Sequence, residues 1–178
     1  IQKGESLLEE RTSLQGQLRI GASDTICRYF LIPYLEKFHR EYPDVRIRVT
    51  NQTSIGCADL LENGQVDLIV TNAPNSYLHP RYPSFPIFQF QDCFVASLRA
   101  FPLQEKVLTL QELTGYPILM LGRSTTSEYL HNLFSSHHLK LIPEVELSSN
   151  DLLMDLARIG LGIAFVPDYM LAKEIFLF

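Results

Sequence analysis

The sequence predicts an α/β protein in which strands alternate with helices. Three observations lead to this prediction. Short alternating or apolar segments, typical of strands, are each followed by a segment with apolar residues at helical spacing. Clusters of Ser, Thr, Asp and Asn stand between them, where they can cap the helices. The same order of elements recurs in both halves of the chain, although the two halves do not align residue by residue.

The chain enters this pattern through a strand and a long helix. Residues 17–22 alternate as a strand, and the small polar residues 23–25 begin a helix whose apolar residues recur at helical spacing. Pro33 lies inside that helix, where it removes one backbone donor and crowds the preceding turn. We therefore expect a kink or a fresh helix start near Phe30.

Two more strands complete the first half. Residues 46–51 alternate as the second strand, and residues 54–62 form a second helix that Asn63 and Gly64 end. Residues 65–72 are an apolar strand of the kind that is buried on both faces. Two strand-to-helix units followed by a third strand predict a parallel sheet.

The second half repeats this order after a proline-rich crossing segment at residues 73–87, which we expect to be irregular. The elements predicted there are a strand at 90–97, a short helix at 108–117, a buried strand at 117–122, a helix capped by hydroxyl residues within 123–139, and a strand, a capped helix and a terminal strand within 144–170.

Composition narrows the class of protein. The chain has 178 residues, 46% hydrophobic and 20% charged, which is enough apolar material for one or two small cores. No apolar run approaches the roughly 20 residues of a membrane span, and no basic stretch leads into an apolar one as in a secretion signal. The three cysteines lie far apart without a CxxC spacing, so we expect neither disulfides nor zinc, and a cytoplasmic location.

The charge balance argues against direct contact with nucleic acid. The formal net charge is −5, and lysine and arginine form no stripe along the chain. If the protein acts on DNA, we expect another segment to contact the DNA.

No residue pattern indicates catalysis or a metal site. The sequence contains no GxSxG, HExxH, P-loop or GxGxxG motif. His137 and His138 are adjacent, so on a helix they point about 100° apart and cannot chelate one metal. Cys27 stands near a helix start, as a redox sensor would, but its place on an apolar face favours a core position. We therefore expect no enzyme activity, metal or cofactor.

The polar clusters instead predict a binding site. In open parallel sheets, ligands lie beyond the carboxyl ends of strands, where helix N-termini present unpaired backbone donors. The clusters that follow strands are residues 23–25, 52–54, 71–72, 124–126 and 148–150. Donors and hydroxyls that converge from two lobes suit a small carboxylate or another polar metabolite. Each cluster alone is more typical of an ordinary helix cap, and the charge of Asp24 opposes a purely anionic ligand.

Three motifs in a fixed order carry a family resemblance. They are P-x-L-x-x-F-x-x-x-Y-P-x-V at 33–45, N-G-x-x-D at 63–67 and G-L-G-x-x-x-x-P at 160–167. With them, the chain from about Gln17 to Met170 resembles the effector-binding domain of LysR-type transcriptional regulators. The resemblance implies an α/β fold of two Rossmann-like lobes with a ligand cleft between them, which is the type 2 periplasmic-binding-protein fold.

The same resemblance implies a domain layout and partners. Residues 1–15 would be the end of a linker helix, residues 16–91 and 168–178 the first lobe, and residues 92–167 the second lobe. DNA would be read only through a domain absent from this chain. Subunits would pair as a homodimer or higher homo-oligomer through the first lobe, and no contact with a membrane is expected.

The function implied is that of a ligand-sensing regulatory domain that binds a small-molecule inducer between the lobes. A solute-binding receptor of a transporter is the alternative with the same fold, and a catalytic α/β domain is a more distant one. The ligand-binding positions that the resemblance implies are Ser23, Thr25, Ser54, Thr71, Ser124, Thr125, Thr126, Ser149 and Phe165.

Overall fold

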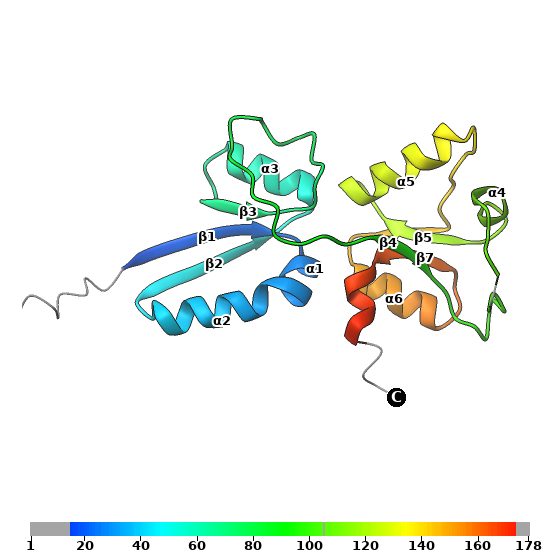
Figure 1. Ribbon diagram of the computed structural model, residues 1–178, viewed down its shortest axis with the longest axis horizontal. Helices are drawn as coiled ribbons and strands as arrows, with labels where there is room; N and C mark the ends of the chain where they lie inside the picture. The colour runs from blue at the N-terminus through cyan, green and yellow to red at the C-terminus, as the bar shows by residue number, and fades with distance from the viewer. Residues whose placement is uncertain (1–14, 105, 174–178) are drawn as a thin grey trace, which may run out of the picture.

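The computed structural model describes residues 15–104 and 106–173, which form two α/β lobes side by side (Figure 1). The linker helix expected at residues 1–15 lies outside this part of the chain except for Gln15, and residues 174–178 lie outside it too. No helix in the described part is both long and apolar enough to cross a bilayer.

The first lobe has a three-stranded parallel sheet with the strand order β2-β1-β3, which confirms the parallel sheet predicted from the first half of the chain. Its elements are β1 (Gly16–Ala22), α1 (Asp24–Ile26), a π-helical turn (Cys27–Leu31), α2 (Ile32–Glu41), β2 (Val45–Asn51), α3 (Ser54–Glu62) and β3 (Leu68–Val70).

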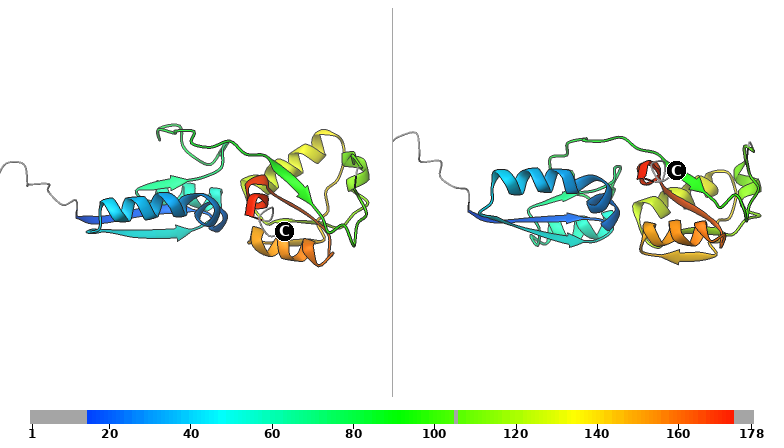
Figure 2. Two further views of the ribbon diagram at one scale, coloured as in Figure 1. Left: turned by 60° about the horizontal axis from the view of Figure 1, so that its bottom comes forward. Right: turned by 90° about the horizontal axis from the view of Figure 1, so that it is seen from below.

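Helices cover both faces of this first sheet, as Figures 1 and 2 show. Successive residues of a strand point to opposite faces. Ile20 and Ala22 of β1 therefore pack with Leu31 on the α2 side, while Gly21 faces α3 and leaves room for Cys57 there. The strand and helix periods of the sequence thus build one small core in this lobe.

Pro33 explains the break in the first long helix. A π-helical turn ends at Leu31, and α2 begins at Ile32 with Pro33 in its first turn. A helix tolerates proline there because the backbone N–H groups of the first turn have no intrahelical partner. Ile26, Cys27, Leu31 and Ile32 all keep right-handed helical backbone angles, so the kink or fresh start expected near Phe30 is a π-helical turn within a continuing helix.

The third strand differs from its prediction. β3 covers only Leu68–Val70, and Leu68 is 39% exposed, so the prediction of a strand at 65–72 buried on both faces is wrong. In the described residues β3 pairs only with β1 and stands at the edge of the sheet. Apolar composition does not distinguish such an edge strand from a central one.

The second lobe has four strands in the order β4-β7-β5-β6, with β4 antiparallel to β7 and the other pairs parallel. Its elements are β4 (Asp92–Val95), α4 (Leu110–Leu113), β5 (Ile118–Leu121), α5 (Thr125–Ser136), β6 (Val145–Leu147), α6 (Asn150–Arg158), β7 (Ile163–Pro167) and a 3-10 turn, η2 (Asp168–Lys173). The proline-rich crossing at 73–87 contains neither helix nor strand, as expected.

The centre of the second lobe is β7, which is buried at every position. Phe165 packs on the α5 side with Phe134, and Val166 packs on the α6 side with Leu153. Met170 of η2 belongs to the same α6-side core. The assignment of residues 168–178 to the first lobe stays a prediction.

Candidate ligand-binding site

A cavity of about 250 Å³ lies between the two lobes. Its walls come from the segments that follow β1, β2, β5 and β6, so both sheets direct the carboxyl ends of strands toward it. The lining residues are Ser23, Asp24, Thr25, Asn51, Gln52, Thr53, Ser54, Asn72, Leu121, Ser124, Thr125, Thr126, Ser148, Ser149, Asn150, Pro167 and Tyr169.

Four helix starts meet at this cavity. The N-caps of α1, α3, α5 and α6 are Ser23, Thr53, Ser124 and Ser149, and all four line it. Each side-chain oxygen accepts a hydrogen bond from a backbone N–H three residues later, at 3.2, 3.2, 3.1 and 3.3 Å respectively. The remaining first-turn N–H groups and the helix dipoles place partial positive charge at the helix ends, while the lining itself contains one carboxylate, Asp24, and no cationic side chain.

Seven of the nine predicted ligand-binding residues line this one cavity. They are Ser23, Thr25, Ser54, Ser124, Thr125, Thr126 and Ser149. Three of these hydroxyls cap helices, and Ser54 Oγ accepts from the backbone N–H of Asn72 at 3.2 Å. Residues that cap helices in the ordinary way can therefore also form part of the cavity wall. Ligand binding by these residues stays a prediction.

The other two predicted residues lie outside the lining. Thr71 supports the wall from behind, since its hydroxyl donates to the Asn72 carbonyl at 3.3 Å and accepts from the Asn75 amide at 3.2 Å. Phe165 is 4% exposed and packs on the Phe94 ring with centroids 4.7 Å apart. It lies two residues before the end of β7, inside the core, whereas Pro167 at the strand end reaches the cavity.

Asn150 and Tyr169 are two of the lining residues that the sequence did not single out as ligand candidates. Asn150 is 7% exposed, and its Nδ2 donates to Thr25 Oγ1 at 3.0 Å, which joins the two lobes inside the cavity. Its signal was its place directly after the Ser149 cap. Tyr169 comes from η2, and burial raises the pKa of its phenol. No strand or cap pattern marks Tyr169, because it enters from a later turn of the chain.

Three further contacts join the lobes around the cavity. The Tyr29 hydroxyl donates to Asp151 Oδ1 at 2.6 Å, and Arg28 Nε lies 3.4 Å from Asp151 Oδ2. On the other side, the Tyr77 hydroxyl donates to Glu128 Oε1 at 2.6 Å. The lobes are therefore held together by polar groups at both margins.

The lining of the cavity contains a single charged side chain. Asp24 is the one acidic residue of the lining, which contains no Lys, Arg or His. Across the described chain, no three His, Cys, Asp or Glu side chains gather as a metal site would require. Burial raises the pKa of Cys57 to about 11 and also raises that of Cys27, so neither thiol is activated as a redox sensor would need.

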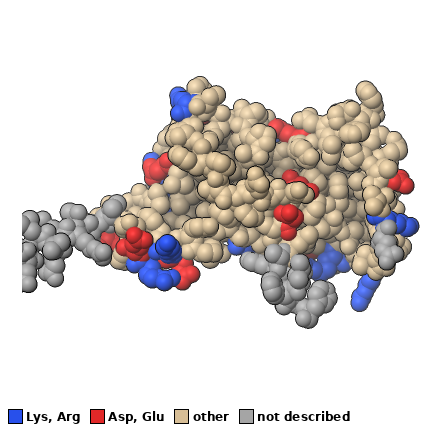
Figure 3. Space-filling model, viewed as in Figure 1, with Lys and Arg blue, Asp and Glu red and all other residues tan. Residues whose placement is uncertain are grey.

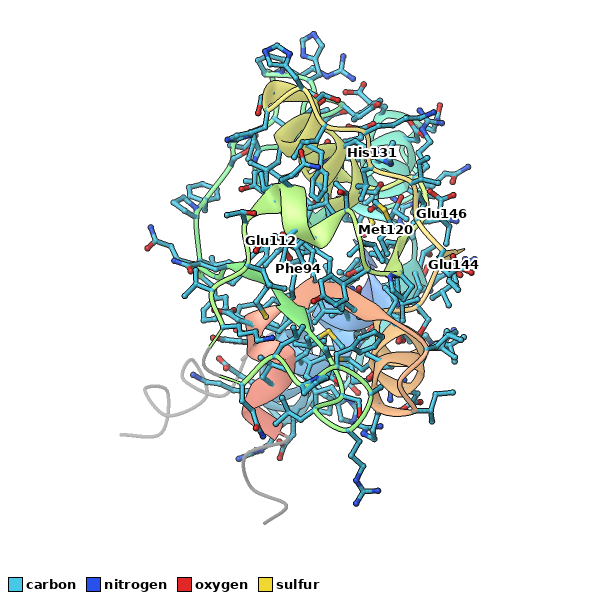
Figure 4. All side chains as sticks on the ribbon, turned by 90° about the vertical axis from the view of Figure 1, so that its right-hand side faces the viewer. Phe94, Glu112, Met120, His131, Glu144 and Glu146 are labelled. Carbon is cyan, nitrogen blue, oxygen red and sulfur yellow. The ribbon has the colours of Figure 1, made fainter. Side chains whose placement is uncertain are left out.

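A second hollow lies on the outer surface of the second lobe, away from the cavity between the lobes. On the face in Figure 3, lysine and arginine side chains lie in scattered groups and form no continuous basic band. A wider hollow of about 470 Å³ lies on the outer side of α5 and β6, where Figure 4 shows His131 and Glu146. None of the predicted ligand-binding residues lines that hollow.

Two α/β lobes that enclose a polar cavity between the carboxyl ends of their strands define a ligand-binding module of the type 2 periplasmic-binding-protein fold. Residues 11–176 match the family model of the LysR substrate binding domain, and the chain belongs to that family.

Curated relatives carry the same assignment. The chain is 30% identical over 156 residues to the HTH-type transcriptional regulator CysB of Haemophilus influenzae, a match that covers 85% of this chain and 47% of CysB. It is 30% identical over 162 residues to the HTH-type transcriptional activator CmpR of Synechocystis, covering 90% of this chain and 52% of CmpR. The chain thus spans about half the length of these relatives.

A solved structure shares the fold. The regulatory domain of CcmR from Synechocystis PCC6803, solved in complex with 2-PG, superposes with a TM-score of 0.77 at 22% identity. The match covers 88% of this chain and 74% of that one. The fold predicted from the resemblance is therefore confirmed.

Proposed function

We propose that this chain is the sensing part of a LysR-type transcriptional regulator and binds a small-molecule effector in the cavity between its lobes. The observation that carries the proposal is the convergence of four helix N-termini, two from each lobe, on one cavity between the lobes. Backbone N–H groups and hydroxyls arranged in this way bind an anionic or polar metabolite. The 2-PG complex of the CcmR domain is consistent with a ligand of this kind.

Binding would regulate by favouring one arrangement of the lobes. A ligand shifts such an equilibrium only by its difference in affinity for the two arrangements. Contacts to both lobes supply that difference, because they form fully only when the lobes enclose the ligand. In the whole regulator, paired subunits would then present their DNA-binding segments, which lie outside this chain, in one arrangement or the other. Such a regulator would act in the cytoplasm.

The relatives favour a regulator over a transporter receptor. CysB and CmpR are transcriptional regulators, and the matched region is about half of each. An enzyme would need a poised acid, base or nucleophile in the cavity. The lining offers hydroxyls, several of which cap helices, one exposed carboxylate and one half-buried phenol, which supports binding rather than turnover.

Alanine substitutions at Thr25 and Ser54 test the site. A thermal-shift screen of metabolites first identifies a ligand, since a molecule that binds only the folded chain raises its melting temperature. Isothermal titration calorimetry then compares the wild type with Thr25→Ala and Ser54→Ala. Each variant should bind about 0.5–3 kcal/mol more weakly, because it loses one hydrogen bond in a buried setting.

Matched controls separate binding from stability. Thr114→Ala and Ser136→Ala also remove hydroxyls, but these residues are exposed and lie outside the cavity lining. Both controls should bind the ligand as the wild type does. Unchanged affinity in Thr25→Ala and Ser54→Ala would contradict the assignment of the site.

A further inference from the structure

The Asn150 side chain bonds directly across the cavity to another lining residue, Thr25. It lies in the first turn of α6 in the second lobe, and its amide donates to the Thr25 hydroxyl of the first lobe at 3.0 Å. With 7% of its surface exposed, Asn150 is removed from bulk water. Its polar atoms must therefore find partners in the protein or in a bound molecule.

One end of this amide has no protein partner. Asn150 Oδ1 is buried and unpaired among the residues that the structure describes. A threonine hydroxyl both donates and accepts, so either end of the amide can pair with Thr25. Whichever end does so, the other remains buried without a partner, which is costly unless a ligand supplies a matching polar group.

The other lining residues favour two different groups on the ligand, an anionic group and a hydrogen-bond donor. The helix N-termini favour an anionic group, and no cationic side chain of the lining competes for it. Asp24 adds an exposed carboxylate, whose Oδ2 lies 3.4 Å from Arg28 Nη2 and which can accept further hydrogen bonds. The part of the ligand that is not the anion therefore has to carry a hydrogen-bond donor.

We infer that Asn150 is a specificity-determining residue and that the ligand is a small acid bearing a second polar group, a hydroxyl or an ammonium, which bonds to the Asn150 amide. This inference rests on the proposed function. A cavity of about 250 Å³ suits a compact molecule of this class. The Thr25 hydroxyl would hold the amide in place from the opposite lobe, so the same bond that joins the lobes also orients the selecting group.

Paired acids that differ by one polar group test the inference. The wild-type chain is titrated by calorimetry with acetate and glycolate, propionate and lactate, and propionate and alanine. The hydroxy or amino member of at least one pair should bind about 5- to 100-fold more tightly than its partner, as expected for one buried hydrogen bond. Asn150→Leu, which keeps a side chain of similar size, should abolish that preference.

Two more variants keep the test informative. Asn132→Leu makes the same replacement at an exposed asparagine outside the cavity and should retain the wild-type preference. Asn150→Asp keeps an acceptor if Asn150→Leu does not fold, and its added charge should weaken binding of every acid while preserving the preference for alanine over propionate.

The outcomes separate this inference from the proposed function. If the plain acids bind the wild type as tightly as their substituted partners, the inference fails and the sensor function stands. If the preference survives in Asn150→Leu, the assignment to Asn150 is overturned. If no acid binds the wild-type chain, the proposal of an acid-sensing cavity fails and the inference fails with it.

Discussion

The two lobes share an order of elements but differ in how they are packed. The first lobe has three strands and a buried core of Ile20, Ala22, Ile26 and Leu31. The second has four strands, with separate buried cores on the two sides of β7. Because hydrophobic stabilisation scales with buried apolar area, the second lobe carries more of it in the described chain.

The contacts between the lobes combine polar and aromatic groups, since the Tyr29 ring packs against the second-lobe core with its centroid 6.2 Å from that of Tyr169. Thr25 with Asn150 and Tyr29 with Asp151 are hydrogen bonds between polar groups that water can replace when the lobes separate. A polar interface between two packed units permits relative motion more readily than an apolar one. The comparison therefore predicts two stable bodies with an adjustable joint, which is what a sensor requires.

Truncation in the second core should have the largest effect. Phe134 is fully buried at 0% exposure, so Phe134→Ala leaves a cavity and should lower the free energy of unfolding by about 3–5 kcal/mol. Urea denaturation followed by circular dichroism measures this change. Leu18→Ala removes a half-buried side chain from the first lobe and should cost less. Equal losses would break the contrast between the lobes.

Removal of one hydroxyl from the joint should have an intermediate effect. Tyr29→Phe deletes the hydrogen bond to the Asp151 carboxylate and should cost about 1.5–3 kcal/mol, the range for hydrogen bonds to charged groups. The same deletion at Tyr34, which is 59% exposed, should leave thermal stability nearly unchanged. If both variants melt alike, the Tyr29 contact does not hold the lobes together.

The features of this fold that the sequence could predict are the local ones, such as helix caps and helix breaks. Ser23, Ser124 and Ser149 all cap helices, and the break before Pro33 lies where proline requires it. These features depend on neighbours three or four residues away, and patterns of that range are visible in the chain itself.

Features that depend on distant pairing could not be predicted in this way. The exposure of Leu68 follows from the edge position of β3, and the antiparallel entry of β4 follows from its pairing with β7. The bond from Asn150 to Thr25 joins residues 125 positions apart. The polar clusters predicted which strand ends face the cavity, but only the packed lobes decide which side chains meet across it.

A substitution at the boundary between the crossing segment and the second lobe should have the smallest effect on stability. This effect should also depend on pH. Burial, with Asp168 nearby, raises the pKa of Asp92 from 3.8 to about 6. The folded state therefore binds more protons than the unfolded state between these values, so stability falls as pH rises through this window. Asp92→Asn should be more stable than the wild type above that pH, by on the order of 1 kcal/mol after solvent screening.

Melting curves across the pH range should show this advantage vanish near pH 4, by about the pKa of an unperturbed aspartate, while Asp44→Asn at an exposed turn shows none. An advantage that persists in acid would mean that Asp92 destabilises the boundary by its packing rather than by its charge.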